Sequence, residues 1–112
     1  IKKELIYVFK EFKNQIFSEY IYTILLNKDK LKKNRDDLID HLKLKGIDTT
    51  VHYIPANKHR YYKKKFSKFN VRNSDYIFAN IVSIPFHNHL SKNQVFKIAK
   101  NIIKFVSENE KK

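Results

Sequence analysis

Hydrophobic and polar positions recur with different periods along the chain, and each period predicts a type of element. Residues 19–26 form a short apolar run of β-branched and aromatic side chains, which favours a largely buried strand. Both faces of this predicted strand are apolar. We therefore expect one surface of the sheet to be covered by another domain. Before this strand, apolar residues at helical spacing predict an amphipathic helix over 1–12, with a stripe of Ile1, Leu5, Val8, Phe9 and Phe12.

Residues 34–47 carry helix signals at both ends. Asn34 is a suitable N-cap, and Asp36 and Asp37 would lie at the positive end of the helix dipole. Gly46, the only glycine in the chain, is expected to end the helix in the left-handed conformation, so replacing it should cost about 1 kcal/mol. The buried face is expected to hold Leu38 and Leu42.

The last helix is predicted from a capping box over 91–94, in which Ser91 and Gln94 bond to each other's backbone. Residues 108–112 lack its periodicity and are expected to fray. Its buried stripe is expected to consist of Val95, Ile98, Ala99, Ile102 and Val106. Between these two helices the pattern predicts a strand over 48–54, helical turns within 61–69, a helix from Asn73 or Ser74 to about Asn80, and a strand over 81–84.

This order of elements predicts an α/β (α+β) fold, a two-layer sandwich in which helices cover a small, mainly antiparallel sheet. The 112 residues suffice for a single domain, 1–112. No apolar run reaches the roughly 18 residues of a membrane span and no signal peptide is evident, so a cytoplasmic protein is expected. Without cysteine, disulfides and thiolate metal sites are excluded.

The net charge of +13 suggests a polyanionic partner such as nucleic acid. Only Arg35, Arg60 and Arg72 are arginines, although arginine is the residue that forks onto phosphates. A general drift of the composition toward lysine explains the charge equally simply. Two interpretations stay open: a solvated lysine-rich surface, or a basic nucleic-acid-binding module built on Lys68, residues 63–65 and neighbouring tyrosines.

The five histidines give little support for a metal site. His41 is expected on the polar face of its helix, in solvent. His87 and His89 are spaced by two, with neither cysteines nor carboxylates nearby, which is a poor zinc pattern. There is also no glycine-rich phosphate loop and no nucleophile elbow, so the residues alone identify no catalytic group.

His52, Tyr53, His59 and Arg60 lie where a predicted strand ends and an aromatic, basic stretch begins. Functional residues often lie at such strand ends. A neutral imidazole can donate to sugar hydroxyls, and a guanidinium can fork onto a phosphate. The alternative is that the tyrosines of this stretch are half-buried packing residues with their hydroxyls in water.

Several motifs, in order and at their spacing, resemble the DegT/DnrJ/StrS family of pyridoxal-phosphate-dependent aminotransferases, which act on nucleotide-linked keto-sugars. The motifs are Arg-Asp-Asp-Leu-Ile at 35–39, Lys-Gly-Ile at 45–47, Val-His-Tyr-Ile-Pro at 51–55, Tyr-Tyr at 61–62, Ser-Ile-Pro-Phe-His at 83–87 and Leu-Ser at 90–91. The matching region is the small C-terminal domain of these fold type I enzymes. The resemblance implies that the large domain, with the cofactor pocket and the Schiff-base lysine, is absent from these 112 residues.

By the resemblance, His52 faces the cofactor and sugar, with Tyr53, Asn57 and Arg60 as further substrate-binding residues and no catalytic residue in this chain. Where the family commonly has a second histidine, this chain has Asn57, which cannot take up a proton near neutral pH. The resemblance also implies an amino group transferred from glutamate, a homodimer, and a role in polysaccharide or glycan biosynthesis. A dehydratase with the same cofactor and a standalone regulatory or vestigial domain stay open as alternatives.

Overall fold

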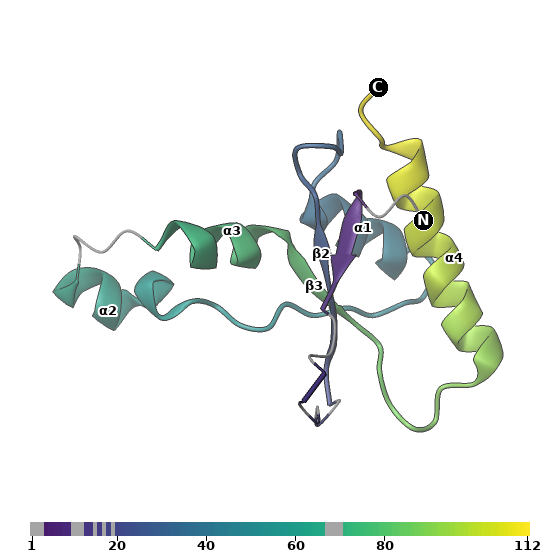
Figure 1. Ribbon diagram of the computed structural model, residues 1–112, viewed down its shortest axis with the longest axis horizontal. Coiled ribbons are helices and arrows are strands. Elements are labelled where there is room, and N and C mark those ends of the chain that lie inside the picture. Colours follow the sequence, from purple (N-terminus) through teal and green to yellow (C-terminus); the bar gives the residue numbers. More distant parts are fainter. Residues whose placement is uncertain (1–3, 10–12, 15, 17, 19, 67–70) are drawn as a thin grey trace.

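A three-stranded antiparallel sheet in the spatial order β1-β2-β3 lies at the centre of the molecule (Figure 1). The computed structural model describes residues 4–9, 13–14, 16, 18, 20–66 and 71–112. This arrangement confirms the predicted two-layer α/β architecture with an antiparallel sheet. The strands are β1 (Ile6–Val8), β2 (Tyr22–Leu26) and β3 (Ile81–Ile84), and the helices are α1 (Arg35–Lys43), the 3-10 turn η1 (Ala56–Lys58), α2 (Arg60–Lys65), α3 (Arg72–Asn80) and α4 (Lys92–Glu108).

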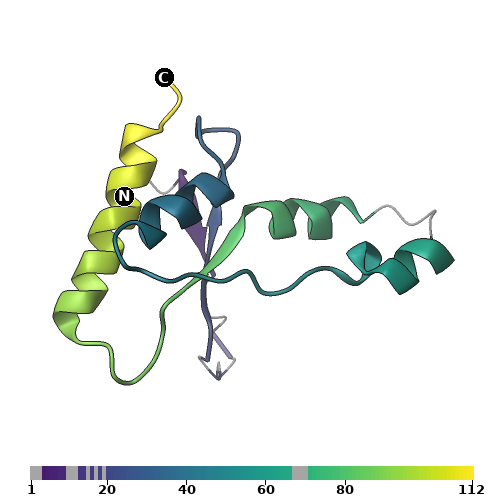
Figure 2. The ribbon, with the colours of Figure 1, turned by 180° about the vertical axis from the view of Figure 1, so that it is seen from behind.

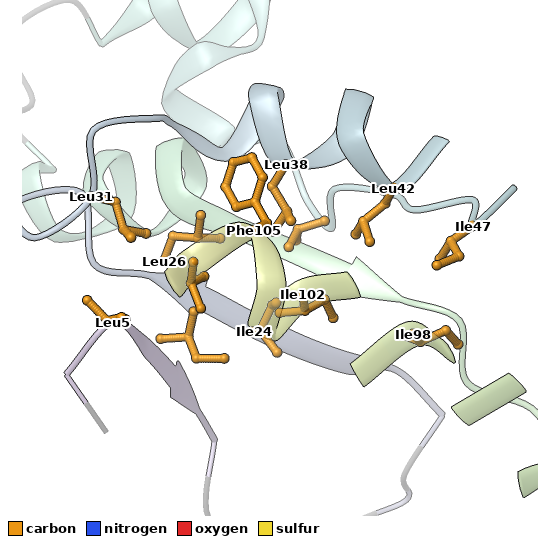
Figure 3. Packing of buried hydrophobic residues seen from close by; sticks show 13 residues of the cluster. Leu5, Ile24, Leu26, Leu31, Leu38, Leu42, Ile47, Ile98, Ile102 and Phe105 are labelled. Carbon is orange, nitrogen blue, oxygen red and sulfur yellow. The ribbon is translucent and has the colours of Figure 1, made fainter. Parts of the chain in front are cut away.

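The hydrophobic core lies between the sheet and the pair α1 and α4. Figures 1 and 2 show these two helices on one side of the sheet, while α3 and α2 extend away on the other side. Figure 3 shows side chains from α1, α4 and the strands converging on this layer. None of the helices in the described residues is long and apolar enough to cross a bilayer. The core cluster comprises Leu5, Ile6, Ile24, Leu26, Leu31, Leu38, Leu42, Ile47, Val82, Ile98, Ile102, Phe105 and Val106.

The helix predicted for 1–12 is wrong in its described part, because residues Ile6–Val8 form strand β1. Ile6 pairs with Leu26 in an antiparallel register, and the Asn27 amide donates to the Leu5 carbonyl over 2.9 Å. The Asn27 side chain also donates to the Glu4 carbonyl over 2.8 Å. Sheet pairing therefore outweighs the helical spacing, and Phe9, expected in the stripe, is 59% exposed.

Both ends of α1 form as predicted. The Asn34 side chain accepts from the amides of Asp36 and Asp37, and the Asp37 carboxylate accepts from the Asn34 amide in return. Leu38 and Leu42 are fully buried. At the other end, Gly46 has φ +68° and donates to the Lys43 carbonyl, and Ile47 donates to the Leu42 carbonyl. These are the two bonds of a Schellman motif, and the apolar residue beyond the glycine is buried.

Gly46→Ala is expected to lower the free energy of unfolding by about 1 kcal/mol, measured by urea denaturation. A β-carbon at this position would meet no atom within 4 Å, so the loss comes from the left-handed backbone conformation and not from a steric clash. Gly46→Asn is the matched control, because asparagine tolerates this conformation, and it should lose less. Equal losses for both variants would contradict the explanation.

The strand predicted for 48–54 is wrong: only Thr50 forms a bridge, with Ser83 on the outer edge of β3. The Thr50 amide donates to the Ser83 carbonyl over 3.1 Å, and the Ser83 amide donates back over 2.8 Å. The ladder does not continue beyond this bridge, and two residues later the His52 side chain bonds to the Ser83 side chain. The other predicted strands are present, although β2 begins at Tyr22.

Helix α4 begins with the predicted capping box of Ser91 and Gln94. Its stripe is only partly as predicted: Val95 and Ala99 are exposed and, with Ile103, line an open apolar cleft of about 360 Å³ between α4 and the sheet. Phe105, absent from the predicted stripe, is buried.

Residues 109–111 do not fray, contrary to the expectation for 108–112. Glu110 forms a bridge with Leu31, the Lys32 amide donates to the Asn109 carbonyl over 2.8 Å, and the Lys111 amide donates to the Lys30 carbonyl over 2.9 Å. A segment without hydrophobic periodicity is thus fixed by backbone pairing, which the side-chain pattern does not reveal.

Residues 56–66 and 71–80 form a projection, here called the arm, that contains η1, α2 and α3 (Figure 2). The helix predicted up to Asn80 is present as α3, and the helical turns predicted within 61–69 correspond to α2, although residues 67–70 lie outside the described part of the chain. Asp75 in α3 anchors η1: it accepts from Asn57 Nδ2 over 3.2 Å and lies 3.0 Å from Lys58 Nζ. These contacts, the one from Lys58 first, lower the pKa of the Asp75 carboxyl.

Asp75→Asn is expected to remove a pH-dependent part of the stability. Because the pKa of Asp75 is lower in the folded chain, its contribution is complete above the unfolded pKa of about 3.9 and is lost as the pH falls through the folded pKa. The stability difference between wild type and variant, from urea midpoints at several pH values, should therefore shrink in acid. A difference that is constant with pH would contradict the Lys58 and Asn57 contacts.

Candidate substrate-facing cleft

A cleft of about 510 Å³ opens where four segments meet: the end of β3, the extended chain after α1, the start of α4, and residues 20–21 before β2. The Thr50–Ser83 bridge fixes the first two segments, and the loop over 85–91 connects β3 to α4 beside them. Apolar groups of Ile47, Ile84 and Leu90 supply part of the wall. The polar side chains in the lining are Tyr20, Asp48, Thr49, Thr50, His52, Ser83, His87, Gln94 and Lys97.

His52 is the half-buried imidazole of this cleft. Its Nδ1 lies 2.9 Å from Ser83 Oγ, so the ring is attached to the edge of the sheet by its side chain, two residues after the Thr50–Ser83 backbone bridge. Ser83 is only 4% exposed. A histidine held by a hydroxyl at one nitrogen keeps the other nitrogen for a second partner.

Thr49 adds a polar group that lacks a partner. Its Oγ1 is enclosed and makes no hydrogen bond within the described residues, and the residue lines the cleft. Buried hydroxyls in folded proteins are normally paired with protein, water or ligand. Thr49 therefore carries an enclosed, unpaired hydroxyl on the same segment as His52.

Tyr53 lies at the rim and does not line the cleft. Its ring is 4.8 Å from that of His52, and it is 67% exposed. A hydrogen bond with the Tyr20 hydroxyl raises the pKa of Tyr53. Two exposed phenols thus lie side by side at the opening, since Tyr20 belongs to the lining.

The other two predicted site residues lie on the arm. Asn57 is bonded to Asp75 through Nδ2, and its Oδ1 is enclosed without a partner in the described part of the chain. Arg60 is exposed in the first turn of α2 and makes no ion pair or hydrogen bond with described residues. The structure brings His52 and Tyr53 together and leaves Asn57 and Arg60 outside the cleft.

Ser83 and Thr49 were missed as site residues. Ser83 is the only polar residue of its predicted strand, which is a weak signal, and its proximity to His52 depends on a pairing between distant segments. Thr49 carries no signal in the sequence. The prediction for His41 is wrong: it is half-buried, its ring is 5.4 Å from Phe105, and its enclosed Nε2 is unpaired among the described residues.

The cleft offers hydrogen-bonding groups and no residue suited to anchor pyridoxal phosphate covalently. A Schiff-base lysine requires a desolvated site. No lysine is among the buried residues of the described chain, and Lys97, the lysine of the lining, is exposed on α4. The rings of His87 and His89 are 6.3 Å apart, and the described residues contain no group of three side chains able to hold a metal ion. The polar side chains of the lining are of the kinds that hydrogen-bond oxygen-rich groups.

Residues 2–103 match the DegT/DnrJ/EryC1/StrS aminotransferase family. Over 92 residues the chain is 34% identical to the uncharacterized protein MJ1066 of Methanocaldococcus jannaschii, covering 80% of this chain and 24% of that protein. It is 28% identical over 95 residues to the UDP-4-amino-4,6-dideoxy-N-acetyl-beta-L-altrosamine transaminase of Campylobacter jejuni, covering 85% of this chain and 25% of that enzyme. The chain therefore spans about a quarter of the length of these curated relatives.

The fold is also similar to that of solved sugar aminotransferases. The putative sugar aminotransferase Spr1654 of Streptococcus pneumoniae, in its PMP form, superposes with a TM-score of 0.77 at 23% identity, covering 93% of this chain and 26% of that one. Spr1654 has also been solved in its PLP form. The similarity places the described elements in the fold of these enzymes.

Proposed function

Because the chain belongs to the DegT/DnrJ/EryC1/StrS aminotransferase family, we propose that it forms the C-terminal, substrate-facing part of an aminotransferase for nucleotide-linked keto-sugars. Its homologues are pyridoxal-phosphate-dependent aminotransferases. The Campylobacter relative is named for an amino group on a UDP-linked sugar, which supports this class of substrate. In the full-length protein the amino group would come from glutamate, and the product would enter polysaccharide or glycan biosynthesis.

The observation that carries the proposal is the cleft around His52. An imidazole, hydroxyls and an amide in a partly apolar wall are the groups that recognise a sugar, which presents hydroxyls on an apolar ring. We assign His52 the role of donating a hydrogen bond to the substrate and positioning it. Tyr53 would contact the substrate at the rim, and Asn57 and Arg60 would do so only where the arm reaches it.

Pyridoxal phosphate would supply the electronic chemistry of the transfer and be held by the remaining three-quarters of the protein. The residues of this chain would bind the sugar, orient it and exclude water. We further propose that the full-length enzyme is a cytoplasmic homodimer, which is supported by the family resemblance and by the absence of cysteine.

The experiment compares the 112-residue chain with the longer protein encoded by the reading frame upstream of Ile1. The longer protein is expected to convert UDP-linked 4-keto-sugars to amino sugars with consumption of glutamate, and to show visible absorption from lysine-bound pyridoxal phosphate. The short chain should show neither. If the longer protein binds the cofactor but transfers an amino group to none of the nucleotide-linked keto-sugars tested, the proposed substrate class is wrong. If the short chain binds the cofactor covalently, the proposed division of roles is wrong.

The arm favours a second candidate, a surface for single-stranded nucleic acid. All residues of α2 are exposed, and the rings of Tyr61 and Tyr62 lie 5.2 Å apart beside Lys63, Lys64 and Lys65. Exposed aromatic rings among lysines are typical of such surfaces, because bases can stack on the rings and phosphates can pair with the lysines. Binding to a single-stranded oligonucleotide that weakens steeply with salt would support this candidate. Neutralising Lys63, Lys64 and Lys65 should weaken this binding. Neutralising Lys97, Lys100 and Lys104 on α4 is the matched control and should weaken it less.

A further inference from the structure

The side chain of Ser83, in strand β3, has a single hydrogen-bond partner among the described residues, the ring of His52. Its backbone is paired on both sides, with Thr23 of β2 and with Thr50. Its Oγ lies 2.9 Å from His52 Nδ1, and within the described residues it has no other hydrogen-bond partner. At 4% exposure the residue is shielded from bulk water.

The direction of this hydrogen bond determines where His52 carries its proton. If Nδ1–H donated to Ser83, the serine hydroxyl proton would be enclosed without an acceptor in the described chain. If the serine hydroxyl donates to Nδ1, no donor is left unpaired. Unpaired buried donors are rare because they lose hydration without compensation. The second arrangement is favoured, and it places the proton of the neutral ring on Nε2.

His52 Nε2 is available to a ligand. It makes no hydrogen bond with the described residues, and it is not among the enclosed, unpaired atoms. The residue lines the cleft.

We propose that Ser83 is a positioning residue that holds His52 as the Nε2–H tautomer, so that the cleft presents a fixed hydrogen-bond donor to an acceptor oxygen of the ligand. A keto, hydroxyl or phosphate oxygen would satisfy this donor, whereas an ammonium group would not. The identity of the ligand as a nucleotide-linked keto-sugar rests on the proposed function. The tautomer depends only on the geometry of the 112 residues.

The test is ¹⁵N NMR of the histidine rings in the 112-residue chain at about pH 9, above the ordinary titration range of histidine. Nδ1 of His52, assigned with His52→Asn, is expected at a pyridine-like shift and Nε2 at a pyrrole-like shift. In Ser83→Ala both signals should move toward the tautomer-averaged values of His89, which is exposed. Ser83→Thr, which keeps the hydroxyl, should restore the wild-type shifts.

Thr23→Val is the matched control, because it removes a hydroxyl from the residue paired with Ser83 on β2. It should leave the His52 shifts unchanged. A pyrrole-like Nδ1 in the wild type, or unchanged shifts in a folded Ser83→Ala, would overturn the proposal. Even if Ser83→Ala fails to fold, a pyrrole-like Nδ1 in the wild-type spectrum would still overturn the proposal, and the comparison with Ser83→Thr and His89 still tests it. If the shifts are as expected but the longer protein transfers no amino group to keto-sugars, the positioning role stands and the proposed function fails.

Discussion

Leu42→Ala is expected to lower the free energy of unfolding by about 2–5 kcal/mol. Leu42 is fully buried in α1, where it belongs to the core between α1, α4 and the sheet (Figure 3). Removing three carbons forfeits their burial and leaves a cavity that rigid neighbours fill only in part. Since domains of this size are stable by only about 5–15 kcal/mol, the variant should be mostly or partly unfolded under mild denaturing conditions.

Leu44→Ala is the control for this prediction. Leu44 lies two residues further along, at the end of the same helix, and is 86% exposed. The same chemical change should therefore alter the free energy of unfolding by less than about 0.5 kcal/mol. Urea denaturation followed by circular dichroism measures both. Similar losses for the two variants would mean that Leu42 is not a core residue.

His52→Ala in the longer protein is expected to reduce kcat/KM for the nucleotide-sugar by about 10–100-fold, which corresponds to one hydrogen bond to substrate. The half-buried ring faces the cleft and is attached to Ser83, so its removal leaves the ligand oxygen without that donor. Initial rates of amino-sugar formation measure the effect. The stability of the variant should be checked in parallel, because the ring also packs against Tyr53.

His89→Ala is the matched control. It removes the same ring from an exposed position that is not in the lining of the cleft, and kcat/KM should stay within about twofold of the wild type. A folded His52→Ala enzyme with full activity would contradict the assignment of His52 as a substrate-binding residue. His52→Asn should retain more activity than His52→Ala, because its amide can still donate.

Elements with local signals were predictable from the sequence. Asn34, Gly46 and Ser91 each fix a helix end through bonds to neighbours a few residues away, and all three form as expected. Elements decided by distant partners were not. Residues Ile6–Val8 become a strand because β2 is available to pair, and residues 48–54 do not because only Thr50 meets β3.

The candidate site divides in the same way. His52 could be singled out from its position before Pro55 and from the family resemblance, since both are features of one short segment. Ser83 and the orphan hydroxyl of Thr49 acquire their significance only when the edge of β3 meets the segment after α1. Val95 and Ala99 are exposed because they face the open cleft between α4 and the sheet, which helical periodicity cannot specify.

The bridge between Leu31 and Glu110 has a consequence for the order of folding. It joins the turn after β2 to the residues after α4, and the core side chains Phe105 and Val106 come from the same late part of the sequence. During synthesis, β1, β2 and α1 are therefore made well before the segment that closes over them. Until residues 105–111 leave the ribosome, the apolar face of the nascent sheet stays uncovered and open to chaperones or to misassembly.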